Sequence, residues 1–149
     1  SFGFHASGNA DLIGIVIVAH GGLAREYLAA MEHVVGPQAG ARTVTIEDIH
    51  DRAAKSREIC LAADEVDEGD GVVVVTDLFG GSPSNLSLPA CSARNRVILY
   101  GANLPMLVKL AKLRHLPADQ AAAMAAEAGR KYIDSYNVFD EVVPRKVAQ

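Results

Sequence analysis

Residues 13–22 read IGIVIVAHGG, an aliphatic run that leads directly into a histidine and two glycines. Five of the six residues before Ala19 are aliphatic, which is typical of a strand covered on both faces. His20 therefore stands at the carboxyl end of an expected buried strand, and two residues without side chains follow it. A histidine closing a strand is by itself more often structural than chemical, so its surroundings must decide its role.

Strands and helices alternate along the rest of the chain. Hydrophobic runs predict further strands at about 42–46, 71–76 and 96–100. Helical periodicity predicts helices at about 23–35, 52–66, 84–93, 104–114 and 118–135. This order predicts an α/β fold, doubly wound, with a mainly parallel four-stranded sheet and helices on both faces. The weakly alternating residues 138–147 are a candidate for an extra C-terminal strand.

Length and composition narrow the classes of protein. The 149 residues predict one domain, residues 12–149, after a flexible arm or cloning remnant at 1–11. A net charge of −4 argues against a general nucleic-acid binder, and no apolar run is long enough to insert in a membrane. The two cysteines, Cys60 and Cys91, are too few and too isolated to suggest a disulfide framework or a metal cluster. They are expected to be small buried hydrophobic residues, which fits a reducing cytoplasm.

The carboxyl ends of parallel strands gather at one edge of a sheet, where ligands bind. Three segments are expected there: 19–22 (AHGG), 77–83 (DLFGGSP) and 101–105 (GANLP). If the first and third strands are neighbours, Asp77 can accept a hydrogen bond from one ring nitrogen of His20. That bond would fix the tautomer and leave the other nitrogen as a nucleophilic lone pair.

Glycines surround this expected pair. Gly21 and Gly22 open the first helix, so unpaired backbone N–H groups are expected to point towards the ring. Gly80, Gly81 and the hydroxyl of Ser82 would form a second small loop. Each feature alone is a weak signal, but together they favour a dianion bonded to the imidazole, and a phosphoryl group is the obvious candidate.

Three motifs, IVIVAHG, VTDLFGGSPSN and GANLPML, closely resemble the IIA component of the mannose-family sugar phosphotransferase system over about residues 12–135. The resemblance implies a phosphohistidine carrier, cytoplasmic and without a cofactor, that transfers phosphoryl groups between histidines. It accepts the group from the carrier protein HPr and passes it to a separate IIB protein. It also implies a homodimer in which a C-terminal strand is exchanged between subunits.

Carried over to this chain, the resemblance makes His20 the phosphorylated residue, Asp77 its orienting partner and Ser82 a contact of the phosphoryl oxygens. Asn103 and Pro105 would support the loop after the fourth strand, and no metal is expected at His20. Family members often carry tryptophan where Phe79 stands, and the tail after residue 137 matches less clearly. An apolar collar for partner docking is expected from three residues, Leu78, Phe79 and Leu104.

Other functions stay open on sequence alone. The same chemistry would serve an orphan regulatory phosphorelay module whose phosphorylation state controls a partner rather than sugar uptake. A doubly wound domain that binds a small ligand through His20 is another reading, and the phosphotransfer subunit of dihydroxyacetone kinase has a similar fold. The sugar, if there is one, cannot be read from the chain.

Overall fold

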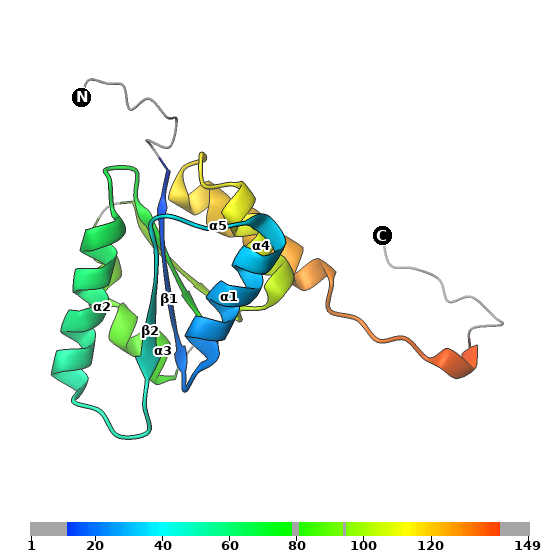
Figure 1. Ribbon diagram of the computed structural model, residues 1–149, viewed down its shortest axis with the longest axis horizontal. Helices are drawn as coiled ribbons and strands as arrows, with labels where there is room; N and C mark the ends of the chain where they lie inside the picture. The colour runs from blue at the N-terminus through cyan, green and yellow to red at the C-terminus, as the bar shows by residue number, and fades with distance from the viewer. Residues whose placement is uncertain (1–11, 79–80, 94, 141–149) are drawn as a thin grey trace.

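The structure, a computed structural model, describes residues 12–78, 81–93 and 95–140, and strands alternate with helices along it (Figure 1). The strands are β1 (Gly14–His20), β2 (Ala41–Ile46), β3 (Val72–Thr76) and β4 (Arg96–Tyr100). The helices are α1 (Leu23–Val35), α2 (Arg52–Val66), α3 (Ser82–Ser87), α4 (Leu104–Lys112) and α5 (Ala118–Lys131). Two short 3-10 turns, η1 (Pro89–Cys91) and η2 (Val138–Asp140), complete the described elements.

The four strands form one parallel sheet in the order β2-β1-β3-β4. Because β3 lies on the far side of β1 from β2, the chain reverses its winding direction between β2 and β3. The carboxyl end of β1, at His20, therefore lies at the switch point in strand order where ligands bind in such folds. The predicted four-stranded, doubly wound parallel sheet is confirmed.

Helices cover both faces of the sheet (Figure 1). α1, α4 and α5 pack on one face, and α2 and α3 pack on the other. Alternate residues of β1 supply the two cores: Ile15 and Ile17 join the first cluster, and Val16 and Val18 join the second. All four side chains are fully buried, which explains why the strand reads as a continuous aliphatic run.

Both cysteines pack against the core between the sheet and α2. Cys60 lies on α2 and Cys91 on η1, and each is partly buried. Burial raises the pKa of the Cys91 thiol to about 11, so this group stays protonated and unreactive at neutral pH. The two residues are thus part of the packing, as predicted.

Three expected elements end differently in the structure. The helix expected at 84–93 is split into α3 and η1, because Pro89 has no N–H to continue the helical hydrogen bonds. The helix expected at 118–135 ends at Lys131, beyond which the chain is exposed and lacks the packing that stabilises a helix. Of the expected strand at 138–147, the part at 138–140 is a 3-10 turn, and 141–149 lie outside the described residues.

A buried arginine, Arg114, closes the amino edge of the sheet. Its side chain is only 5% exposed and donates to the carbonyl oxygens of Ile13 (2.9 Å) and Gly40 (3.3 Å) and to the side chain of Gln38 (3.2 Å). Burial lowers the pKa of Arg114, and no carboxylate among the described residues pairs with it. This guanidinium ties the start of β1 to the residues that lead into β2.

Replacing Arg114 by methionine is expected to lower the free energy of unfolding by about 2–4 kcal/mol, because the buried Ile13 carbonyl loses its donor. Denaturant unfolding followed by circular dichroism measures the change. Arg130→Met, at an exposed position of α5, is the matched control and should change stability by less than about 0.5 kcal/mol. Equal stability of the two variants would contradict a structural role for Arg114.

Candidate functional site

His20 and Asp77 come together at the carboxyl edge of the sheet, although 57 positions separate them in the chain. The Nδ1 atom of His20 lies 2.9 Å from Oδ2 of Asp77, and the backbone N–H of His20 donates to the same oxygen at 3.1 Å. β1 and β3 are adjacent and their last paired residues are Val18 and Thr76, which puts Asp77 beside the end of β1. The sequence predicted this meeting of two distant residues.

The geometry distinguishes the two ring nitrogens. A carboxylate oxygen can only accept a hydrogen bond, so in a neutral ring this contact favours the tautomer with the proton on Nδ1 and the lone pair on Nε2. The side chain of Asp77 is 10% exposed, whereas that of His20 is 49% exposed. A buried carboxylate thus orients a half-exposed imidazole that presents a nucleophilic nitrogen.

Gly81 lies against the edge of the ring. A Cβ atom added there would stand 3.7 Å from Cε1 of His20 and 3.6 Å from Cδ2 of Leu78. Cε1 lies between the two ring nitrogens, so the absence of a side chain at Gly81 leaves room beside Nε2. Ser82 follows directly as the first residue of α3. The expected loop residues Phe79 and Gly80 lie outside the described residues.

The two glycines after His20 differ in their roles. Gly21 has φ +54°, a left-handed conformation that favours glycine, and lets the chain turn sharply from β1 into α1. Its N–H donates to the carbonyl oxygen of Ile46 at 3.0 Å, so the expectation of an unpaired amide is wrong for Gly21: the adjacent strand β2 takes that donor. Gly22 is the N-cap residue of α1 and is exposed.

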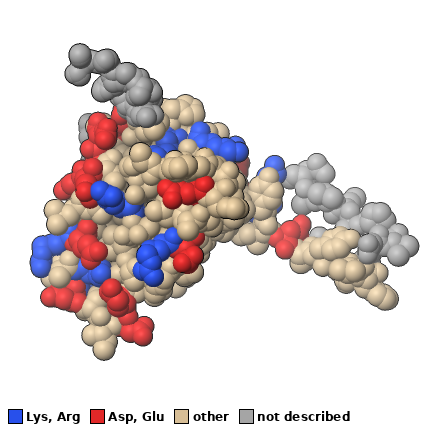
Figure 2. All heavy atoms as spheres, in the orientation of Figure 1, with Lys and Arg blue, Asp and Glu red and all other residues tan. Residues whose placement is uncertain are grey.

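The nearest cation in sequence, Arg25, lies beside Gly22: its Nη2 is 3.5 Å from the position that a Cβ of Gly22 would take. Its Nη1 lies 3.4 Å from the hydroxyl oxygen of Thr45 on β2, whereas the imidazole leans towards the loop after β3. Figure 2 shows acidic and basic side chains interspersed over the face that it presents, without a broad patch of one sign.

Exposed apolar side chains follow the carboxyl ends of three strands, at the edge of the sheet where His20 lies. Leu78 follows Asp77 directly and is 57% exposed, and Leu104, the first residue of α4, is also exposed. Leu23, the first residue of α1, is exposed as well and was missed by the sequence analysis, although its place three residues after His20 was a sufficient signal. Leu78 and Leu104 are thus exposed, as a docking collar would require, and Phe79 lies outside the described residues.

The loop after β4 is fixed by Asn103. Its side-chain oxygen accepts the N–H of Met106 and so caps α4, while its amide nitrogen donates to the carbonyl of Gly129 on α5. Pro105, in the first turn of α4, lacks an N–H that would in any case have no partner inside the helix. These two residues therefore hold backbone in place, in keeping with the supporting role expected of them.

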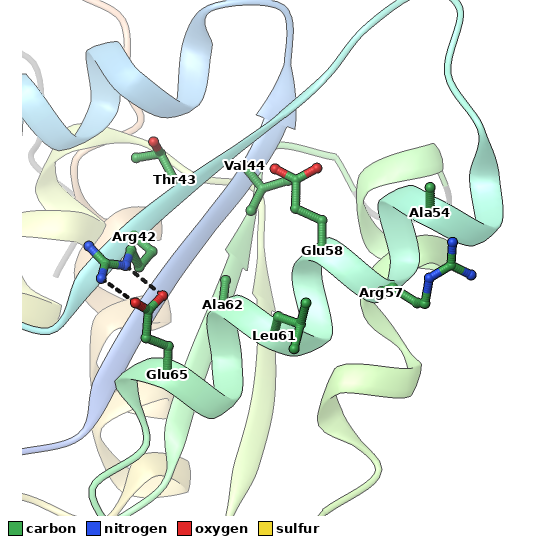
Figure 3. Close-up of a pocket in the computed structure, with 9 residues that line it drawn as sticks. All are labelled: Arg42, Thr43, Val44, Ala54, Arg57, Glu58, Leu61, Ala62 and Glu65. Carbon is green, nitrogen blue, oxygen red and sulfur yellow. Dashed lines mark hydrogen bonds and ion pairs between the residues drawn. The ribbon is translucent and has the colours of Figure 1, made fainter.

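A groove lies elsewhere, on the outer side of the sheet between the edge strand β2 and α2 (Figure 3). Arg42 and Glu65 face each other across it and form a bidentate ion pair at 3.0 and 2.6 Å. None of the residues that line it belongs to the His20 site. Within the described ranges, no three acidic, histidine or cysteine side chains gather to hold a metal, and no helix has the length and apolarity to cross a bilayer.

Comparison with known proteins agrees with this geometry. The family model described as the fructose IIA component of the phosphotransferase system matches residues 14–128. YadI of Escherichia coli K12, itself only provisionally named a phosphotransferase enzyme IIA component, is 29% identical over 104 residues, covering 69% of this chain and 71% of YadI. The mannose-specific EIIAB component of the same strain is 28% identical over 122 residues, covering 80% of this chain but only 38% of that protein.

Solved structures show the same fold. The mannose/sorbose-specific IIA subunit of Enterococcus faecalis superimposes with a TM-score of 0.76 at 23% identity, covering 85% of this chain and 96% of that one. A IIA protein associated with the fucose utilization operon of Streptococcus pneumoniae gives 0.71 at 26% identity, covering 89% and 98%. Because the family model matches most of the sequence, this chain belongs to the mannose-type IIA family of the sugar phosphotransferase system.

Proposed function

We propose that residues 12–149 act as one phosphocarrier domain that accepts a phosphoryl group on Nε2 of His20 from HPr and passes it to a separate IIB protein. The observation that carries this proposal is the 2.9 Å contact between Nδ1 of His20 and Asp77, which leaves Nε2 as the reactive nitrogen of a half-exposed ring. Membership in the IIA family supports HPr as the donor, a IIB protein as the acceptor and the cytoplasm as the location of the exchange.

The transfer needs only positioning and charge stabilisation. The Nε2 lone pair attacks phosphorus in line as the N–P bond of the donor phosphohistidine breaks, and the donor imidazole leaves with that electron pair. The ring of His20 gains positive charge as its new N–P bond forms. The carboxylate of Asp77 stabilises that charge through the Nδ1–H hydrogen bond.

Neutral groups around Nε2 suit a carrier. The amide of Gly22 at the start of α1, the loop of Gly80 and Gly81, and the hydroxyl of Ser82 would receive the phosphoryl oxygens. Each 1.4 kcal/mol by which the site overstabilised phosphohistidine would slow onward transfer about tenfold. Weak neutral donors therefore serve reversible transfer better than an arginine clamp.

The exposed side chains of Leu23, Leu78 and Leu104 would form the centre of the docking surface for both partners, with Phe79 completing the collar expected from the sequence. Exposed leucines close to a reactive nitrogen exclude water once a partner covers them. A carrier must release each partner quickly, so a small contact area is expected.

Intact-mass spectrometry tests the function directly. The purified chain is incubated with phosphoenolpyruvate, enzyme I and HPr, and it should gain one phosphoryl group that is lost on addition of a cognate IIB protein. Omission of HPr is the control and should leave the mass unchanged. A chain that stays unmodified in the complete mixture would refute the proposal and favour a domain that merely binds a small ligand.

Substitution of Gly81 by alanine tests the space beside the ring. The added methyl group would lie in ordinary contact, 3.7 Å from Cε1 of His20, and the φ of Gly81 is −92°, so the fold should tolerate it. Because the methyl group encroaches on the phosphoryl position, the transfer rate from HPr should fall about tenfold or more. Rapid-quench kinetics measures it, with Ala123→Ser at an exposed position of α5 as the control. An unimpaired Gly81→Ala enzyme would show that the phosphoryl group lies elsewhere.

We also propose that the protein is a homodimer held together by its C-terminal segment, as the family resemblance implies. After α5 the chain runs away from the body of the molecule (Figure 1). This segment exposes several large apolar side chains: Tyr132, Ile133, Tyr136, Val138 and Phe139. The most exposed of them is Phe139, whose relative exposure is 89%. A second copy is the partner that would cover them.

Removal of residues 132–149 is therefore expected to convert a dimer into a monomer, which light scattering after size-exclusion chromatography measures. Phosphorylation of His20 should persist in the shortened chain, because every residue of the site precedes the cut. A full-length chain that elutes as a monomer would overturn the dimer. A shortened chain that remains dimeric would move the interface to another surface.

A further inference from the structure

Tyr27, on the first helix, reaches across to the loop that follows β4. Its hydroxyl donates to the carbonyl oxygen of Ala102 at 3.2 Å. Its ring is half-buried against the core formed with α4 and α5, so packing alone could account for an apolar residue here, but not for a hydroxyl. The hydroxyl therefore calls for its own explanation.

The carbonyl that Tyr27 holds is linked by hydrogen bonds to the catalytic pair. The N–H of Ala102 donates to the carbonyl of Thr76 at 3.1 Å, and Thr76 is covalently followed by Asp77. Asp77 in turn accepts from both the backbone and the ring of His20. These connections return to their starting point, because Tyr27 lies on α1 and α1 begins three residues after His20 in the chain.

These hydrogen bonds set the orientation of the Asp77 carboxylate. The bond from Ala102 fixes the plane of the Thr76–Asp77 peptide, and that plane determines the direction in which the side chain of Asp77 leaves the backbone. One oxygen of Asp77, Oδ2, serves His20 twice, whereas Oδ1 is buried and has no hydrogen-bond partner among the described residues. Among the described residues, the orientation of this carboxylate therefore rests on its backbone and on the two bonds to His20.

The phenol of Tyr27 is harder to ionise than a free tyrosine. Its pKa is raised, first by burial and then by the negative charge of Asp77. Tyr27 therefore remains a protonated hydrogen-bond donor throughout the neutral pH range.

We infer that the Tyr27 hydroxyl is a positioning group of the phosphotransfer site, which holds the Ala102 loop and through it keeps Asp77 aligned with Nδ1 of His20. In its kinetic consequence this inference rests on the proposed function. Its structural consequence does not, because the tautomer of the His20 ring can be observed without any phosphoryl donor.

The test compares the wild type with three substitutions at position 27. Tyr27→Phe removes the donor and keeps the ring, and 4-aminophenylalanine at position 27 restores a donor. O-methyltyrosine keeps the oxygen without its proton and takes the place of the phenylalanine variant should that variant fail to fold. Ser92→Ala is the matched control, because it removes an exposed hydroxyl that donates to the carbonyl oxygen of Pro89 at 2.8 Å, outside the site. Melting curves confirm that each chain is folded.

Two readouts separate positioning from packing. In the neutral ring, ¹⁵N chemical shifts of His20 should report the Nδ1–H tautomer in the wild type and a mixture with the Nε2–H tautomer in Tyr27→Phe. The maximal transfer rate from HPr should fall about fivefold at unchanged KM, because alignment rather than docking is lost. The 4-aminophenylalanine variant and Ser92→Ala should match the wild type in both measurements.

Each outcome either supports or overturns the positioning role of Tyr27. A folded Tyr27→Phe chain with wild-type ¹⁵N shifts would overturn the inference, whatever its transfer rate. Failure of 4-aminophenylalanine to restore the wild-type shifts would also overturn it, since the ring and not the donor would then matter. If the wild type itself gains no phosphoryl group, the proposed function fails, while the ¹⁵N comparison still tests whether Tyr27 aligns the pair.

Discussion

A His20→Ala chain is expected to gain no phosphoryl group under conditions in which the wild type is fully modified, a loss of activity to the limit of detection. The reason is chemical, because alanine leaves no nitrogen nucleophile beside Asp77. Intact-mass spectrometry after incubation with phosphoenolpyruvate, enzyme I and HPr measures the result. The fold should survive, because the side chain of His20 is half exposed and is not part of either core cluster.

The matched control is His115→Ala, which removes an exposed histidine after α4. It should be phosphorylated at the wild-type rate. A His20→Ala chain that still gains one phosphoryl group would remove His20 from the mechanism and leave the remaining histidines as candidates. Circular dichroism of both variants separates a chemical loss from a misfolded chain.

An Asp77→Asn chain is expected to accept phosphoryl groups about 100-fold more slowly than the wild type. Asparagine has nearly the same shape, but it removes the negative charge that stabilises positive charge on the His20 ring, and its amide can present a donor to Nδ1 and select the wrong tautomer. Rapid-quench transfer from phosphorylated HPr measures the rate. The loss should appear in the maximal rate more than in KM, because Asp77 is buried and does not form the docking surface.

Asp119→Asn, in the first turn of α5, is a control of equal charge change on an exposed aspartate. It should transfer at the wild-type rate. If Asp77→Asn is equally fast, the carboxylate has no orienting role and the contact with His20 serves only to join β1 to β3. Such a result would leave His20 as the nucleophile but would require another source of charge stabilisation.

The strands and their order were predictable because they depend on simple patterns. An aliphatic run such as Ile15–Val18 can bury all of its side chains only when both faces of the strand are covered. That condition favours parallel strands connected by crossover helices. The pairing of His20 with Asp77 followed from the same rule, since neighbouring strand ends share one edge of the sheet. Local breaks in helices were harder to predict, because Pro89 divides a segment whose periodicity suggested one helix.

Details that depend on contacts between distant segments could not be read from the chain. Nothing in the sequence shows that Nδ1 rather than Nε2 faces Asp77, or that β2 takes the N–H of Gly21. Helical spacing alone places Tyr27 on the buried face of α1 and accounts for its ring. Its hydroxyl acquires meaning only when Ala102, 75 positions later, is seen beside it.

The position of the phosphoryl group on the imidazole tests the central claim most directly. Two-dimensional ¹H–¹⁵N NMR of the phosphorylated protein, with nitrogen–phosphorus coupling, identifies both the residue and the nitrogen atom that carries phosphorus. Because Nδ1 is held by Asp77, we predict phosphorus on Nε2 of His20 and a retained proton on Nδ1. Phosphorus on Nδ1, or on a side chain other than His20, would contradict the account.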